Sequence, residues 1–271
     1  MNEKYLTLKK YLADLGSAAV AFSGGVDSAF LLYAACDALG TDKVLAITAA
    51  AECMLSRESK EAEDFCREIG AAQKKVVIEQ LEIDGFAENP ENRCYICKSA
   101  LFTELRKAAA GSGYAALIDG TNMDDTGDFR PGMKALAELG IVSPLKDCGI
   151  YKKDIREMSK ELGLPTWDKP SFACLASRFP YGERITQQKL DIVEGAEEVL
   201  RSLGFTQYRV RIHEAGSCGF IASVEVLPEE FDLFERSRDG IEERFMELGF
   251  ARTDLDPAGY RTGSLNKNAS V

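Results

Sequence analysis

The chain has 271 residues, of which 45% are hydrophobic and 28% charged, and its formal net charge at pH 7 is −11. This composition predicts a folded protein with a substantial core, and the acidity disfavours nucleic acid as a partner because an acidic surface repels a phosphate backbone. No apolar run approaches the roughly 20 residues that a membrane-spanning helix needs, and the first residues lack a signal-peptide core. We therefore expect a cytoplasmic protein without membrane contact, whose eight cysteines are thiols or ligands rather than disulfides.

The first two thirds of the chain alternate between apolar strand-like runs and segments with helical periodicity. Strands are expected at residues 18–22, 44–47, 75–78 and 115–118. Helices are expected at residues 6–15, 29–39, 56–69, 98–110 and 151–162. This alternation predicts an α/β fold with a doubly wound parallel sheet, covered by helices on both faces. Ligands of such sheets bind at the carboxyl ends of the strands.

The pattern changes near residue 183. A helix is expected at 187–203, followed by strands at 207–213 and 220–226, a helix at 228–248 and a short strand at 251–255. We therefore predict two domains, an α/β domain at residues 1–183 and a small α+β domain at residues 184–271.

A glycine-rich loop, Ser-Gly-Gly-Val-Asp-Ser, joins the first expected strand to the following helix. Gly24 and Gly25 permit backbone angles closed to other residues, and the helix start offers unpaired N–H groups to an anion. Ser23 and Ser28 add hydroxyl donors, whereas the carboxylate of Asp27 is expected to meet Mg²⁺ or to orient the loop. The loop lacks the lysine of a Walker P-loop and resembles the SGGxDS signature of PP-loop ATP pyrophosphatases. That resemblance implies that residues 1–183 form a PP-loop ATP pyrophosphatase domain, which cleaves ATP between its α- and β-phosphates. Residues 184–271 would then serve substrate binding or oligomerisation.

Three cysteines are candidates for a chemical role. Cys94 and Cys97 form a CxxC motif at the start of an expected helix, and Cys174 lies in the connection before the second domain. Helix N-termini lower the pKa of a thiol, which favours metal binding or redox work. The CxxC is open to several interpretations: a redox pair, half of a zinc site, part of an iron–sulfur site, or simple packing. A structural zinc site needs four ligands, whereas three thiolates can hold three irons of a 4Fe–4S cluster and leave the fourth open for sulfide.

Further motifs extend the resemblance along nearly the whole chain. Residues 23–28, 92–98, 119–125, 130–132, 169–178 and 259–266 together resemble the LarE family. The resemblance implies an ATP-dependent sulfur transferase that makes the nickel-pincer nucleotide cofactor. Such an enzyme adenylylates a carboxylate of pyridinium-3,5-biscarboxylic acid mononucleotide, releases pyrophosphate and AMP, and leaves a thiocarboxylate, twice per product. The resemblance also implies a homo-oligomer.

The family uses two sources of sulfur. In one, the cysteine at the position of Cys174 gives up its own sulfur and becomes dehydroalanine. In the other, a three-cysteine 4Fe–4S cluster carries an extra sulfide and turns over catalytically. The presence of Cys94 and Cys97 beside Cys174 favours the cluster type, and the sacrificial route remains open because Cys174 serves in both.

The remaining candidates are charged residues. Asp124 and Asp125 are candidate ATP or Mg²⁺ residues, with a solvated turn as the alternative. A phosphate and carboxylates on the substrate require cations, and the candidates are Arg178, Arg209, Arg211 and Arg261. Arg209 and Arg211 face the same side of an alternating strand, for which a solvated face is the alternative. Glu198 and Glu225 are candidates for an acidic or metal-binding site.

Other functions are compatible with a PP-loop. A tRNA-thiolating enzyme would share the ATP and cysteine chemistry but needs a basic RNA-binding surface, which the net charge of −11 disfavours. An amide-forming synthetase leaves the CxxC and Cys174 without a role. A non-enzymatic nucleotide-binding module leaves the coincidence of the glycine loop with the cysteine motifs without a reason.

Overall fold

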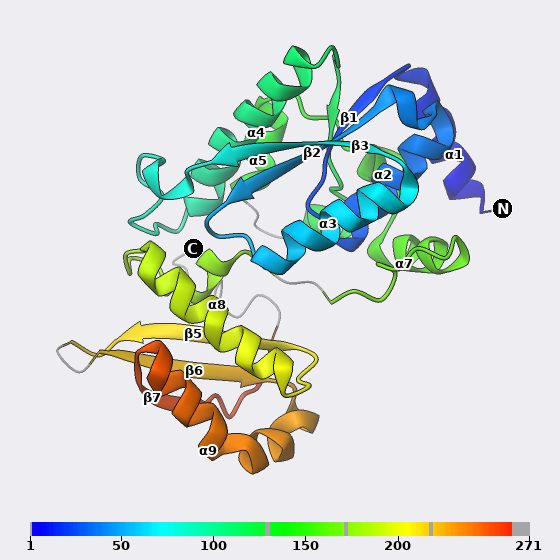
Figure 1. Cartoon of the computed structure of the whole chain (residues 1–271). Helices are drawn as coiled ribbons and strands as arrows, with labels where there is room; N and C mark the ends of the chain where they lie inside the picture. Colours follow the sequence, from blue (N-terminus) through cyan, green and yellow to red (C-terminus); the bar gives the residue numbers. More distant parts are fainter. Residues whose placement is uncertain (1, 128–130, 171–172, 217–218, 262–271) are drawn as a thin grey trace. The chain divides into compact units, whose positions relative to one another are not determined.

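The computed structural model describes residues 2–127, 131–170, 173–216 and 219–261. The chain forms two compact units (Figure 1). The first contains Met1–Ile83 and Cys94–Ser171, and the second contains Asp84–Arg93 and Phe172–Val271. The sequence pattern placed the change at residue 183 and assigned no role in the second unit to residues 84–93. The two functional domains stay a prediction, because this division is by contacts alone.

The first unit is built on a parallel sheet of order β3-β2-β1-β4. Its strands are β1 (Ala18–Ala21), β2 (Val44–Ala51), β3 (Ala72–Ile78) and β4 (Leu117–Ile118). The chain moves outward from β1 to β3 and then returns to the other side of β1. The strand order therefore reverses between β1 and β4, and ligands of open α/β sheets bind at the carboxyl ends of strands beside such a switch point. The predicted parallel sheet is confirmed.

Helices cover both faces of this sheet. One face packs against α1 (Glu3–Asp14), α2 (Val26–Leu39), α3 (Ser56–Ile69), α6 (Pro144–Asp147) and α7 (Lys152–Glu161). The other face packs against α4 (Arg93–Gly111) and α5 (Pro131–Glu138). The side chains alternate accordingly, since Val20 and Ala46 belong to the first core and Ala19 and Leu45 to the second. The doubly wound arrangement follows from strands that are apolar on both faces.

Several short elements were not predicted from the sequence. They are the 3-10 helices η1 (Thr41–Lys43), η2 (Gln80–Glu82) and η3 (Met123–Gly127), together with α5 and α6. Helices this short are unstable alone and form through tertiary contacts, which a sequence pattern does not record. Helix α4 begins at Arg93 rather than at residue 98, so the CxxC motif lies within its first turns.

The second unit is an α+β structure, as predicted. Strands β5 (Tyr208–Glu214) and β6 (Phe220–Val226) are antiparallel, and β7 (Phe250–Leu255) lies parallel to β6. Helices α8 (Gln187–Ser202) and α9 (Phe231–Leu248) contact each other, while α8 packs on β5 and α9 on β7. The 3-10 helices η4 (Leu175–Arg178) and η6 (Pro228–Glu230) precede α8 and α9. Residues 84–93 join this unit through backbone bonds from Ile185 to Ala87 (2.8 Å) and from Gly182 to Asn89 (2.9 Å).

Candidate active site

The glycine loop follows β1 and leads into α2. Gly24 has φ of 75°, and a Cβ there would lie 3.1 Å from the Cβ of Ala62. The hydroxyl oxygens of Ser23 and Ser28 lie 3.1 Å apart, and Ser28 Oγ donates to the carbonyl of Gly25 at 3.1 Å. Gly25 is the N-cap of α2 and provides no side-chain cap, so the first N–H groups of the helix are not capped by that residue. Such a helix start is suited to binding an anion.

A second loop meets the glycine loop at the switch point. It follows β4 and contains Gly120, where a Cβ would lie 3.0 Å from the backbone nitrogen of Ser28. A larger residue at this position would therefore have to push this loop away from the start of α2. The neighbouring carboxylate of Asp119 is buried and accepts hydrogen bonds from Thr121 and from Ser143 (2.6 Å). These hydrogen bonds and the close packing at Gly120 hold this loop against the glycine loop.

Asp27, the predicted Mg²⁺ residue, is the charged residue of the glycine loop. Its Oδ2 accepts a hydrogen bond from Lys152 Nζ at 2.7 Å, while its Oδ1 is buried and has no hydrogen-bond partner among the described residues. Burial raises the pKa of Asp27, the charge of Lys152 works against that rise, and the nearby Asp125 adds to it. A buried carboxylate oxygen without a donor fits a hard divalent cation such as Mg²⁺. Asp27 therefore has the donor chemistry that Mg²⁺ needs, and its contact with the metal stays a prediction.

Two lysines at this site were missed as functional residues by the sequence analysis. Lys152 starts α7, and Lys169 Nζ donates to the carbonyl of Gly24 at 3.0 Å and lies 2.7 Å from a carboxylate oxygen of Glu61. A lysine in the first turn of a helix is disfavoured by the helix dipole, and that signal could have indicated a partner for Lys152. Lys169 lies in one of the motifs shared with the LarE family, but nothing in its spacing connects it to Gly24.

The carboxylates of Asp124 and Asp125 accept hydrogen bonds from backbone N–H groups. Asp124 Oδ2 accepts from the backbone nitrogen of Lys152 at 2.7 Å, and Asp125 Oδ2 accepts from that of Asn122 at 3.0 Å. Asp124 thus ties η3 to the first residue of α7, from which Lys152 reaches Asp27. Their direct contact with ATP or Mg²⁺ stays a prediction.

The CxxC motif lies on the first turns of α4. Cys94 is exposed and Cys97 is half-buried, and residues three apart on a helix share one face. Neither side chain is joined to another described cysteine by a disulfide. No three Cys, His, Asp or Glu side chains in the described part of the chain are grouped closely enough to hold a metal ion. The cluster therefore stays a proposal.

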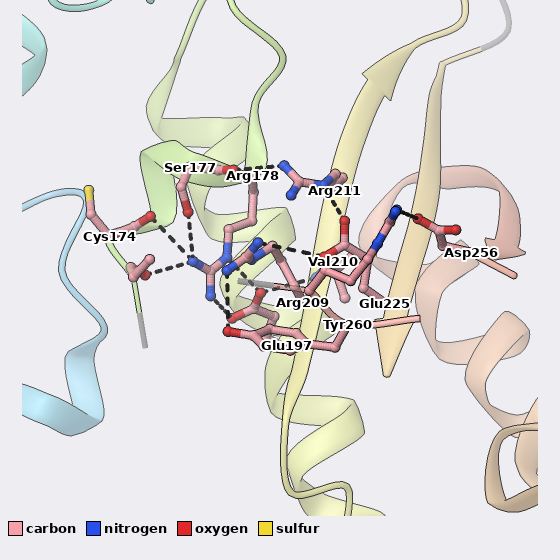
Figure 2. A network of polar contacts seen from close by, with 12 residues as sticks. Cys174, Ser177, Arg178, Glu197, Arg209, Val210, Arg211, Glu225, Asp256 and Tyr260 are labelled. Atoms are coloured by element: carbon pink, nitrogen blue, oxygen red, sulfur yellow. Dashed lines mark hydrogen bonds and ion pairs between the residues drawn. The ribbon is translucent and has the colours of Figure 1, made fainter. Parts of the chain in front are cut away.

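Cys174 lies in a loop of the second unit, residues 173–180, which we call the cysteine loop. The Cys174 side chain is exposed, whereas its backbone is held by the guanidinium of Arg178 (Figure 2). Arg178 Nη1 donates to the carbonyls of Ala173 (2.6 Å) and Cys174 (3.3 Å) and to Ser177 Oγ (3.0 Å). The arrangement presents a solvent-accessible sulfur on a fixed backbone.

The cysteine loop is also held from residues 84–93. Asn89, whose φ is 55°, donates its side-chain amide to the carbonyl of Pro180 at 2.6 Å. Arg93 is 4% exposed and donates to the carbonyl of Ala176 at 2.9 Å and to Asn89 Oδ1. The residue that directly precedes Cys94 in the chain is therefore a support of the loop that carries Cys174.

Arg178 is paired with Glu197 of α8. The two guanidinium–carboxylate bonds measure 2.7 and 2.8 Å, and both side chains are 1% exposed. Burial opposes the charge of Arg178, but Glu197 outweighs it and raises the pKa of the guanidinium. Glu197 also accepts from the backbone nitrogen of Val210 on β5 at 3.1 Å. These contacts occupy Arg178, which therefore positions the cysteine loop.

Arg209 and Arg211 do not lie on a solvated strand face, since they are 6% and 9% exposed. Arg211 donates to Glu225 (2.5 Å) and to the carbonyl of Ser177 (3.0 Å). Arg209 lies 3.6 Å from Glu225 and stacks on the ring of Tyr260 at 5.0 Å. Burial lowers the pKa of Arg209, and the charges of Arg178 and Arg211 lower it further. The three arginines share two buried carboxylates, an arrangement that favours an anion nearby.

The remaining predicted residues lie at the surface or outside the described residues. Arg261 is 47% exposed and 3.8 Å from Asp256. Glu198 pairs with Arg201 on an exposed surface, and the buried Glu225 pairs with Arg209 and Arg211, so an acidic or metal-binding site at these residues stays a prediction. Parts of the motifs shared with the LarE family, namely Arg130, Ser171, Phe172 and residues 262–266, lie outside the described residues. No described helix is long and apolar enough to cross a membrane.

The sheet order and the glycine loop at its switch point define a PP-loop ATP-utilising fold. The sequence model of the NAD synthase family matches residues 1–106. An uncharacterised protein of Synechocystis is 41% identical over 98% of both chains. The pyridinium-3,5-bisthiocarboxylic acid mononucleotide synthase of Lactiplantibacillus plantarum is 36% identical over 97% of this chain and 94% of its own. The chain belongs to the LarE family of ATP-dependent sulfur transferases.

Proposed function

We propose that this enzyme converts the carboxylates of pyridinium-3,5-biscarboxylic acid mononucleotide into thiocarboxylates for the nickel-pincer nucleotide. The observation that carries the proposal is the 36% identity to the L. plantarum synthase along 97% of this chain. The match includes both the glycine loop and the cysteine loop, so it covers the parts of the chain that the two chemical steps need.

The first step is adenylylation. A substrate carboxylate oxygen attacks the α-phosphorus of ATP, and the bond to the β-phosphate oxygen breaks to release pyrophosphate. The N–H groups of the glycine loop bind the departing pyrophosphate. Asp27 would hold Mg²⁺, which neutralises phosphate charge when bound. Lys152 and Lys169 supply the cationic groups that the glycine loop itself lacks, and a bound nucleotide competes for them with Asp27, Glu58 and Glu61.

The second step is sulfur transfer. A sulfur nucleophile attacks the acyl carbon of the mixed anhydride, the bond to the phosphate oxygen breaks, and AMP leaves. Cys94, Cys97 and Cys174 are the thiols that would ligate a 4Fe–4S cluster. When bound, such a cluster supplies sulfide at an iron without a protein ligand. The cysteine loop contributes a fixed backbone, and its exposed side chain leaves the sulfur of Cys174 accessible.

The substrate is anionic, and the second unit offers buried cations for it. Arg209 and Arg211 are candidates for the phosphate of the mononucleotide, because bidentate guanidinium contacts suit phosphate oxygens. Arg261 is a candidate for the same substrate from the surface of the unit. Arg178 acts on the reaction through the backbone of Cys174 rather than by direct contact.

The test is iron and acid-labile sulfide analysis of protein purified without oxygen, alongside Cys94→Ala, Cys97→Ala and Cys174→Ala. Each variant should lose the broad visible absorption that the wild type shows, whereas Cys148→Ala, which removes a thiol outside the motifs, should keep it. If the wild-type protein takes up no iron when it is reconstituted without oxygen, the cluster hypothesis is wrong. A single turnover per chain, with Cys174 converted to dehydroalanine, would then establish the sacrificial route.

The activity itself is tested separately. With the biscarboxylic mononucleotide present, ATP should yield AMP and pyrophosphate, and mass spectrometry should detect the thiocarboxylate. Absence of substrate-dependent AMP would overturn the proposal whatever the iron content. Light scattering on the same preparation tests the homo-oligomer that the family resemblance implies.

A further inference from the structure

Gln80 lies beside the CxxC motif but in no shared motif. It starts η2, directly after β3, and its side chain is 3% exposed. A buried primary amide needs partners for its oxygen and for its NH₂ group. The identity of those partners determines what the side chain does.

The oxygen of the Gln80 amide is committed to the backbone. Oε1 accepts from the backbone nitrogen of Cys53, a fully buried residue, at 3.0 Å. The backbone nitrogen of Gln80 in turn donates to Glu52 Oε2 at 2.7 Å. A flipped amide would set its NH₂ group against the N–H of Cys53, so the hydrogen-bond chemistry fixes the orientation.

The NH₂ group then faces a sulfur. Gln80 Nε2 donates to Cys97 Sγ at 3.0 Å. An amide NH₂ group can only donate, and a thiol sulfur is a weak acceptor. A thiolate or a metal-bound sulfur carries more negative charge and accepts the bond better. The amide is thus oriented for an electron-rich sulfur on Cys97.

We propose that Gln80 is a positioning residue for the sulfur of Cys97, which it holds by an N–H···S hydrogen bond and which would be a ligand of the proposed cluster. The inference rests on the proposed function for the identity of the cluster. Hydrogen bonds to ligand sulfurs withdraw charge and raise the reduction potential of an iron–sulfur cluster. Gln80 therefore distinguishes the two cysteines of the motif, since Cys97 is half-buried and held while Cys94 is exposed.

The first experiment measures the midpoint potential of the reconstituted cluster by spectroelectrochemistry. Gln80→Leu removes the donor and should lower the potential. Gln80→Glu keeps an acceptor for Cys53 and adds negative charge, and it should lower the potential further. Gln73→Leu is the matched control, because Gln73 of β3 donates to Thr48 Oγ1 at 2.9 Å instead of to a cysteine. A potential equal to that of the wild type in both Gln80 variants would overturn the proposal.

The second experiment needs no iron. In protein labelled with ¹⁵N at the glutamine amides, the Gln80 side-chain signals are assigned by their loss in Gln80→Glu. They should shift in Cys97→Ala and stay in place in Cys94→Ala. Equal shifts in both variants, or a shift in neither, would refute the contact. If wild-type protein binds no iron, the cluster fails, and this measurement still decides whether Gln80 holds Cys97.

Discussion

Two ion pairs in this enzyme, which join residues 125 and 19 positions apart in the sequence, differ in burial and in the hydrogen bonds that their atoms make. The Asp27–Lys152 pair of the glycine loop is 27–28% exposed, and Asp27 Oδ1 has no hydrogen-bond partner among the described residues. The Arg178–Glu197 pair of the second unit is 1% exposed on each side, and Glu197 also binds the backbone of Val210. The first pair has an oxygen that can still contact a ligand, whereas the atoms of the second pair bind other groups of the protein.

The difference in burial indicates that the Asp27–Lys152 pair can bind a ligand, whereas the Arg178–Glu197 pair stabilises the fold. A partly exposed lysine can exchange a carboxylate for a phosphate at modest cost, because water compensates the old partner. A buried arginine cannot leave its carboxylate without stranding a charge. We therefore expect substitutions at the glycine loop to act mainly on catalysis, and substitutions at the Arg178–Glu197 pair to act mainly on folding.

The largest effect is expected for Glu197→Ala. The change leaves Arg178 buried without its carboxylate, and breaking a buried pair by removing one partner costs about 3–5 kcal/mol. Urea unfolding should show a loss of this size. The neighbouring Glu198→Ala is the control, since the Glu198–Arg201 pair is about half exposed on each side and should contribute at most about 1 kcal/mol. Equal losses in the two variants would contradict the contrast.

Asp27→Asn should separate activity from stability. Substrate-dependent AMP formation should fall about 100-fold, the size of effect that follows loss of one group stabilising transition-state charge. The free energy of unfolding without ligand should change little, because burial raises the pKa of Asp27 and its charge is only partly offset by Lys152. Kinetics and urea unfolding on the same preparation make the comparison. If Asp27→Asn lowers the free energy of unfolding as much as Glu197→Ala does, Asp27 stabilises the fold rather than binding a ligand.

The sequence predicted the parallel sheet, the small α+β domain and the glycine loop because each depends on local patterns. Alternating apolar runs and glycines at a strand end are visible without tertiary contacts. The partners of the loop were not visible in this way. Lys152 reaches Asp27 from 125 residues away along the chain, and Lys169 reaches Gly24 from 145 away.

The arginines illustrate the same limit. The alternation of β5 correctly placed Arg209 and Arg211 on one face, but it could not tell a solvated face from a buried one. Burial there depends on the cysteine loop, whose Ser177 carbonyl accepts from Arg211. Gln80 gave no signal at all, because a lone glutamine after a strand is ordinary until its partner is known.

A smaller effect is expected for Gly24→Ala. An L-residue in the left-handed region costs about 1–2 kcal/mol, and the contact with Ala62 adds to it. Gly16→Ala is the control, because Gly16 has φ of 72° and a Cβ added there would meet no atom within 4 Å. Both variants should lose stability in urea unfolding, but only Gly24→Ala should also lose AMP formation. Loss of AMP formation in Gly16→Ala would show that backbone strain alone, rather than the loop, limits activity.

The smallest effect on folding is expected for Arg261→Ala. Arg261 is 47% exposed and 3.8 Å from Asp256, and pairs of this kind contribute at most about 1 kcal/mol. Because folding is barely changed, a rise in KM for the mononucleotide would report binding directly, and kcat should stay near that of the wild type if Arg261 binds substrate without taking part in the chemical step. An unchanged KM would assign Arg261 to the surface and leave substrate recognition to the buried arginines. A fall in kcat without a change in KM would instead mean that Arg261 acts in the chemical step rather than in substrate binding.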